Sequence, residues 1–303
     1  NVATPAPYFP PLTNNTMAVL TILNLVAYIA NFAVVFFITS FPGAKSNPEL
    51  SEKYQTIITP AGYAFAIWGI IFVAQAIWAV AQLFQYKNHP LVVDAIRYNY
   101  VFVCLAQVAW SLLFAYEQIL VSLVAMLSIW YFLIQSVRGL KAVVEEESST
   151  SQSSFWLLQF PFLIHCGWIT AASFVNISVV FVYFHAGATL QAIVGFTSLL
   201  TLVAAALLIS KDDAVIPCVL AWATFAIFNE LASPKSLIES TFSPSLIDTT
   251  RWMALGGCII ILVTVVYRVA MKARAASTIA TNNEGEESVY LRHHEEESNG
   301  GSS

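Results

Sequence analysis

Hydrophobic residues occur along this chain in long runs that are separated by short polar segments. A helix needs about 20 mostly apolar residues to span a bilayer, and eight runs come close to that length. We therefore predict eight membrane-spanning helices, at residues 17–41, 62–84, 98–115, 118–140, 159–184, 188–209, 214–231 and 252–271. Only one or two residues around Glu117 separate the third run from the fourth, which predicts a tight antiparallel hairpin.

The seventh run is the least regular of the eight. It contains Pro217 and ends in Asn229 and Glu230, so it also suits a short or re-entrant helix. Beyond the last run the chain becomes acidic and polar, and we expect this C-terminal tail to be disordered.

Composition agrees with a membrane protein. The chain has 303 residues, of which 58% are hydrophobic and 10% are charged, against about 45–50% and 25% in ordinary soluble proteins. Its mean hydropathy is +0.70. So few charges cannot cover so much apolar surface in water, which excludes a soluble enzyme. The net charge of −5, with no basic stripe, excludes a nucleic-acid-binding protein. We therefore expect an all-α fold, a polytopic transmembrane helix bundle.

The distribution of Lys and Arg predicts the orientation of this bundle, because cytoplasmic loops are richer in both. Eight spans place both termini on one side, which carries nine of these residues, while the other side carries four. The nine are Lys87, Arg97, Arg138, Lys141, Lys211, Arg268, Lys272, Arg274 and Arg292. The four are Lys45, Lys53, Lys235 and Arg251. We therefore expect a multi-pass membrane protein with cytoplasmic N- and C-termini.

Charged groups are almost absent from the predicted spans, where they would mark ion paths or proton relays. Glu117 and Glu230 lie only at span ends, which argues against a charge-driven pump. No nucleotide-binding loop, serine-hydrolase motif or zinc-protease motif occurs, so we expect no enzymatic activity. The four cysteines form no CxxC pair, which argues against a disulfide framework or a zinc site built from them.

Four predicted spans instead carry stripes of polar and aromatic residues, because residues three or four apart are neighbours on a helix. Two interpretations are open: hydrogen bonds between packed helices, or a shared cavity for a flat, mostly apolar ligand. The stripes are Asn24, Tyr28 and Asn31; Phe65, Trp68, Phe72 and Gln75; Gln107, Trp110, Ser111 and Phe114; and His165, Trp168, Ala172 and Asn176.

His165 allows two interpretations of its own. A single histidine on an apolar face is commonly a packing residue. Alternatively, it could hydrogen-bond a ligand carboxylate or contact a bound metalloporphyrin. It has no second ligand at metal-binding spacing, so we expect no metal site.

Three motifs occur in order along the first five spans. Residues 59–68 read TPAGYAFAIW, the third span carries Asn99, Trp110 and Phe114, and the fifth carries Pro161 followed by W-x-x-x-A-x-x-x-N. Together they resemble the motifs of the tryptophan-rich sensory protein or translocator protein family (TspO/MBR, peripheral benzodiazepine receptor). In that family the first motif reads TPPGWxFxxxW, so Ala61 replaces a proline here and Tyr63 replaces a tryptophan.

The resemblance covers residues 17–184 and implies a five-helix translocator-like core. It divides the rest of the chain into a short proline-rich tail at 1–16, three additional transmembrane helices at 185–273, as in longer eight-helix members, and the acidic tail at 274–303.

The resemblance further implies a non-enzymatic membrane receptor or carrier that binds a planar hydrophobic ligand in an aromatic pocket. It requires no cofactor, but a porphyrin- or haem-type molecule or a sterol would be the ligand, and members often form homodimers within the lipid. The alternatives are a facilitative small-molecule transporter or channel, and a structural membrane subunit. The candidate ligand-binding residues are Phe65, Trp68, Trp110, Phe114, His165, Trp168 and Asn176.

Overall fold

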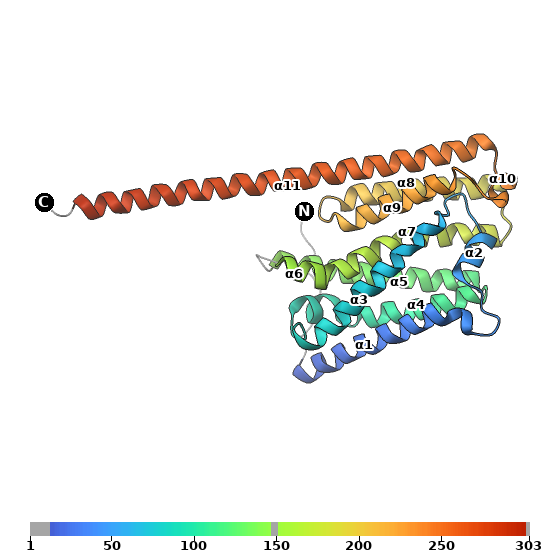
Figure 1. Ribbon diagram of the computed structural model, residues 1–303, viewed down its shortest axis with the longest axis horizontal. Coiled ribbons are helices and arrows are strands. Elements are labelled where there is room, and N and C mark those ends of the chain that lie inside the picture. Colours follow the sequence, from blue (N-terminus) through green and yellow to red (C-terminus); the bar gives the residue numbers. More distant parts are fainter. Residues whose placement is uncertain (1–12, 147–150, 301–303) are drawn as a thin grey trace.

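The molecule is a bundle of long helices that run alternately up and down (Figure 1). The computed structural model describes residues 13–146 and 151–300, and every regular element in those ranges is helical. This confirms the expected all-α class. The long helices are α1 (Asn14–Phe37), α3 (Ile67–Phe84), α4 (Asn99–Ala115), α5 (Ile119–Glu146), α7 (Phe160–Tyr183), α8 (Ala188–Ile209), α9 (Val215–Glu230) and α11 (Pro244–Gly300).

Short helical segments join the long ones. The loop after α1 contains α2, whose first turn is closed by a capping box between Ser46 and Glu49. The short segments are η1 (Ile38–Ser40), α2 (Asn47–Lys53), η2 (Gly62–Ala66), η3 (Leu91–Ile96), α6 (Gln152–Ser154), η4 (Phe155–Gln159) and α10 (Ser236–Thr241).

Six helical segments in the described residues are long and apolar enough to cross a membrane, by length and composition. The two other predicted spans, α4 and α9, are shorter apolar helices. Pro217 lies near the start of α9, where a missing N–H breaks no hydrogen bond within the helix. The seventh span is therefore a short regular helix.

The chain reverses direction sharply between α4 and α5. Glu117 has a φ of 58°, and α4 ends only two residues before it at Ala115. The hairpin expected at this point is therefore present. The start of α1 lies at the same end of the bundle as the C-terminal end of α11, while α2 and α10 lie at the opposite end (Figure 1). Which end faces the cytoplasm stays a prediction.

The C-terminal part of α11 differs from the expected disorder. The helix continues through the acidic segment to Gly300, whereas residues 301–303 lie outside the described residues. Extension of an existing helix adds one hydrogen bond for each residue that is fixed, so propagation is easier than initiation. At the other end, Thr13 caps α1, so this helix begins within the expected tail at 1–16, of which residues 1–12 are not described.

One apolar core extends through both the five-helix segment and the three helices that follow it. It contains Leu202 of α8, Val219 of α9 and Ile261 of α11 together with residues of α3, α4, α5 and α7. A second apolar cluster joins Ile57 and Ile58, which precede α3, to α8–α11. The three additional helices therefore pack directly against the elements that carry the candidate site.

Candidate ligand-binding pocket

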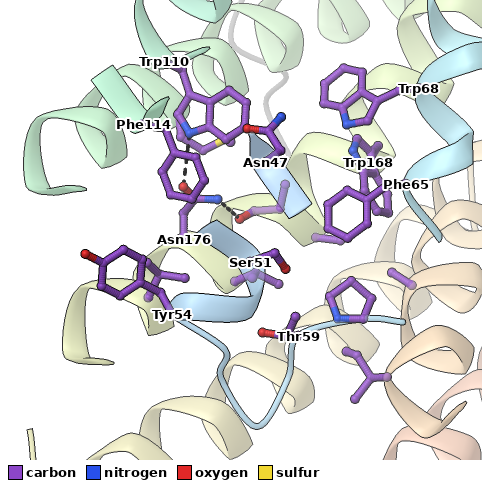
Figure 2. Close-up of a pocket in the computed structure, with 18 of the residues that line it drawn as sticks. Asn47, Ser51, Tyr54, Thr59, Phe65, Trp68, Trp110, Phe114, Trp168 and Asn176 are labelled. Atoms are coloured by element: carbon purple, nitrogen blue, oxygen red, sulfur yellow. Dashed lines mark hydrogen bonds between the residues drawn. The ribbon is translucent and has the colours of Figure 1, made fainter. Parts of the chain in front are cut away.

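A pocket lies inside the bundle where α2, α3, α4, α7 and α9 approach one another (Figure 2). With its open mouth included, it holds about 780 Å³ of space that no atoms fill. Its aromatic lining residues are Tyr54, Phe65, Trp68, Trp110, Phe114 and Trp168. The polar ones are Asn47, Ser51, Thr59 and Asn176, and the others are Pro60, Met126, Ala171, Ala172, Val175, Val179, Leu202, Ala223 and Ile227.

Two groups of aromatic rings face each other across this pocket (Figure 2). On the α4 side, Trp110 and Phe114 are stacked, with their ring centroids 5.2 Å apart and their planes 14° apart. On the other side, Trp168 meets Phe65 and Trp68 edge-on, at centroid distances of 5.6 and 6.4 Å. The i, i+4 spacing of Trp110 and Phe114 turns both toward the same space.

Asn176 links two walls of the pocket. Its Oδ1 accepts a hydrogen bond from Trp110 Nε1 at 3.1 Å, and its Nδ2 donates to the Ala172 carbonyl at 2.9 Å. The first bond joins α7 to α4 and fixes the orientation of the Trp110 ring. Asn176 therefore lines the pocket while it holds two helices together.

His165 lies outside the pocket, although its spacing placed it on the same stripe as Trp168. Its side chain is fully buried, and its Nδ1 lies 2.8 Å from Nε2 of Gln75 on α3. The Tyr100 hydroxyl in turn donates to Gln75 Oε1 at 3.2 Å. The ring also contacts Trp68 edge-on, at a centroid distance of 5.6 Å. His165 thus packs between helices, because three residues on a helix rotate it about 60° away from Trp168 toward α3.

The stripe on α1 is also a packing stripe. Asn24 Nδ2 donates to Gln82 Oε1 at 3.0 Å, and the Tyr28 hydroxyl donates to the Phe72 carbonyl at 3.1 Å. Both bonds join α1 to α3. Hydrogen bonding between helices therefore accounts for Asn24 and Tyr28 on α1 and for the pair His165–Gln75, whereas Asn176 both bonds to another helix and lines the pocket.

The loop after α1 supplies pocket residues that the stripes did not indicate. Asn47, Ser51 and Tyr54 come from α2 and the residue after it, while Thr59 and Pro60 come from the segment that precedes α3. Thr59 and Pro60 open the motif TPAGYAFAIW, whereas for Asn47, Ser51 and Tyr54 the sequence signal was the pair of lysines in this loop on the same predicted side as Glu117.

Glu117 holds this loop against the α4–α5 hairpin. Its carboxylate accepts hydrogen bonds from the ammonium groups of Lys45 and Lys53 and from the hydroxyl of Tyr54. These donors, the lysines first, lower the pKa of Glu117 to about 2. The same three donors stabilise the charged carboxylate, so at neutral pH a charge cluster holds the loop that carries Asn47, Ser51 and Tyr54.

The lining offers little chemistry other than binding. Apart from Asn47, Ser51, Thr59 and Asn176, the side chains that surround the space are apolar or aromatic. Within the described ranges, no group of three or more His, Cys, Asp or Glu residues is placed to hold a metal ion. A flat slot between two aromatic walls is suited to hold a planar hydrophobic molecule by stacking.

Comparison with known proteins gives one match. A family model described as TSPO-like protein matches residues 21–267. This match extends from α1 into α11 and so includes α8 and α9 as well as the five helices before them. No curated protein and no solved structure matches the chain.

Proposed function

Because this chain is a multi-pass membrane protein of the TSPO-like family, we propose that it is a non-enzymatic receptor or carrier that binds a planar hydrophobic molecule in the pocket described above. The ligand class is a porphyrin or a sterol. The observation that carries the proposal is the pair of aromatic walls, Trp110 with Phe114 and Trp168 with Phe65 and Trp68, that face each other across a mostly apolar space (Figure 2).

The position of His165 bears on the form of a porphyrin ligand. Because this side chain lies outside the pocket and pairs with Gln75, it is not positioned as an axial ligand to a bound haem iron. Stacking on the aromatic walls is the stronger source of affinity here, and it acts equally on a porphyrin without metal. We therefore favour a metal-free porphyrin over haem.

The pocket also bears on the alternatives. A structural subunit whose helices only pack against partners would have no need of an internal space. A channel or facilitative transporter for polar solutes would need polar groups along a path, whereas this lining is mostly apolar. Homodimer formation stays a prediction, and the binding function does not depend on it.

The test is a titration of the purified protein in lipid nanodiscs with protoporphyrin IX, followed by porphyrin absorbance so that loss of a tryptophan does not alter the signal. Aromatic stacking contributes about 0.5–1.5 kcal/mol beyond buried area, or roughly threefold to tenfold in affinity. We expect a weakening of that size in Trp68→Phe, Trp110→Phe and Trp168→Phe.

The matched control is Trp156→Phe, because Trp156 is largely exposed on the outside of the bundle and does not line the pocket. This variant should bind protoporphyrin IX as the wild type does. Absence of saturable binding by the wild type would refute the proposal. So would unchanged affinity in all three pocket variants.

A further inference from the structure

Helix α9, the second of the three additional helices, is hydrogen-bonded to the segment that leads into α3. Three bonds make this link, and two of them involve backbone carbonyls, which hold the segment irrespective of its side chains. The pairs are Ala61 N–H to the Ala226 carbonyl at 3.1 Å, Trp222 Nε1 to the Ala64 carbonyl at 3.3 Å, and Asn229 Nδ2 to the Tyr63 hydroxyl at 2.6 Å.

Two of these bonds occur where the chain departs from the motif TPPGW. A proline at position 61 has no N–H and could not donate to Ala226. A tryptophan at position 63 offers only a donor and could not accept from Asn229, whereas the Tyr63 hydroxyl does both. The substitutions Ala61 and Tyr63 therefore supply the groups that α9 contacts.

Close helix contacts hold α8 and α9 against the same region. A Cβ atom added to Gly195 of α8 would lie 2.5 Å from Cγ2 of Ile57, and one added to Gly167 of α7 would lie 2.8 Å from Cβ of Val219 on α9. Atoms do not approach that closely, so a larger residue at either position would force the neighbouring side chain to shift. Ile57 is almost fully buried, in a cluster that includes Ile227 of α9.

The face of α9 that makes these contacts also forms part of the pocket wall. Ala223 and Ile227 line the pocket and lie one helical turn apart. The segment that α9 holds carries Pro60 and Phe65, which line the same pocket. Helix α9 thus contributes two side chains directly and positions two more.

We propose that α9 determines which planar ligand the pocket accepts, with the side chains at 223 and 227 setting its width and the bonds to residues 61–64 fixing Phe65. The small side chain of Ala223 leaves room for a broad ring system, while Ile227 fills the space one turn away. This inference rests on the binding function proposed above and assigns the choice between a porphyrin and a sterol to α9.

The experiment compares affinities for protoporphyrin IX, a broad ring, and for cholesterol, a narrower fused ring, in nanodiscs. Ala223→Leu narrows the pocket and should weaken protoporphyrin IX binding by about tenfold or more, since even one methylene group in an apolar pocket can change affinity that much. Cholesterol affinity should change less. The control is Ala204→Leu, which adds the same atoms to an exposed position of α8.

A second variant keeps the test valid if Ala223→Leu does not fold. Ile227→Val removes one methylene group from the pocket wall, which should weaken cholesterol binding by about fourfold and protoporphyrin IX binding less, so that the ratio of the two affinities changes. The thermal midpoint of each variant is measured without ligand.

The positioning role has a readout that needs no ligand. Tyr63→Phe and Asn229→Leu remove the two partners of one hydrogen bond, so their effects on thermal stability should be non-additive in the double variant. Additive effects would overturn the positioning role. Ala204→Leu should keep the wild-type ratio of the affinities for protoporphyrin IX and cholesterol. If the wild type binds either ligand but the α9 variants also keep this ratio, the inference about α9 is overturned and the proposed function stands. Binding of neither ligand by the wild type overturns both.

Discussion

Neutralising Glu117 is expected to loosen the loop after α1, which supplies part of the pocket lining. Its carboxylate joins Lys45, Lys53 and Tyr54, all of which belong to the loop after α1. In Glu117→Gln the side chain keeps its shape but loses its charge, so both lysines lose their counter-ion. The residues of this loop that line the pocket would then be held by packing and by the remaining hydrogen bonds, among them the one from Gln55 to Glu230.

The size of the effect follows from the pKa of Glu117 and the exposure of its partners. Folding lowers this pKa from 4.5 to about 2, which would correspond to about 3.4 kcal/mol at 1.36 kcal/mol per unit if solvent did not screen the charges. The side chains of Lys45 and Lys53 are 44% and 48% exposed, and exposed ion pairs contribute about 0–1 kcal/mol each. We therefore expect Glu117→Gln to lower the free energy of unfolding by about 1–2 kcal/mol at pH 7.

The pH dependence of this contribution has a definite direction. Because folding lowers the pKa of Glu117, its contribution is fully present above the unfolded value of 4.5 and is lost as the pH falls toward about 2. The assay is the thermal midpoint of the wild type and of Glu117→Gln in nanodiscs, from pH 7 to pH 3. The variant should start lower, and the two curves should approach each other below about pH 4.5.

The control is Asp212→Asn, which removes a different carboxylate that pairs with a lysine. Asp212 lies 2.7 Å from the ammonium group of Lys141, with both side chains at least half exposed, so this change should lower stability by about 1 kcal/mol at most. Equal midpoints for the wild type and Glu117→Gln at pH 7 would refute the reasoning. A difference between them that stays constant from pH 7 to pH 3 would also refute it.

Three further predictions concern packing, the buried histidine and topology. Gly195→Ala should lower stability by about 1–3 kcal/mol through overpacking against Ile57, and thermal unfolding should show no such loss in Gly69→Ala, where a Cβ meets nothing within 4 Å. Because His165 lies outside the pocket, His165→Gln should leave protoporphyrin IX affinity unchanged at each pH from 5 to 8; a pH dependence that disappears in this variant would show that the histidine contacts the ligand. A C-terminal tag should be cleaved by protease only from the cytoplasmic side of sealed vesicles, as the nine Lys and Arg residues on the side of the termini predict, and cleavage from outside alone would contradict that orientation.

Hydrophobic pattern alone was sufficient to find the long helices. The boundaries 62–84 and 188–209 agree with the structure, because a membrane span must satisfy its own backbone hydrogen bonds and so is encoded in its own residues. The aromatic residues of α3, α4 and α7 that line the pocket could also be predicted, because each belongs to a stripe of residues that faces into the bundle.

Helical spacing could not place His165 correctly. Helical spacing shows which residues share one broad face of a helix. A pocket occupies only part of that face, and residues on the rest of it contact side chains of another helix. For His165 that side chain is Gln75, 90 positions away in the chain. The packing of α3 against α7 determines whether His165 faces the pocket or Gln75. This packing cannot be read from the sequence of either helix alone.

The role proposed for α9 could not be foreseen for the same reason. Residues Ala61 and Ala226 meet through backbone groups, which every residue except proline carries in full. Seen in the sequence, Ala61 and Tyr63 were only departures from a motif. In the structure the same two positions are where α9 is hydrogen-bonded. Two departures from a family motif thus mark the place where an additional helix is bonded, which is why we place the test of ligand choice on α9.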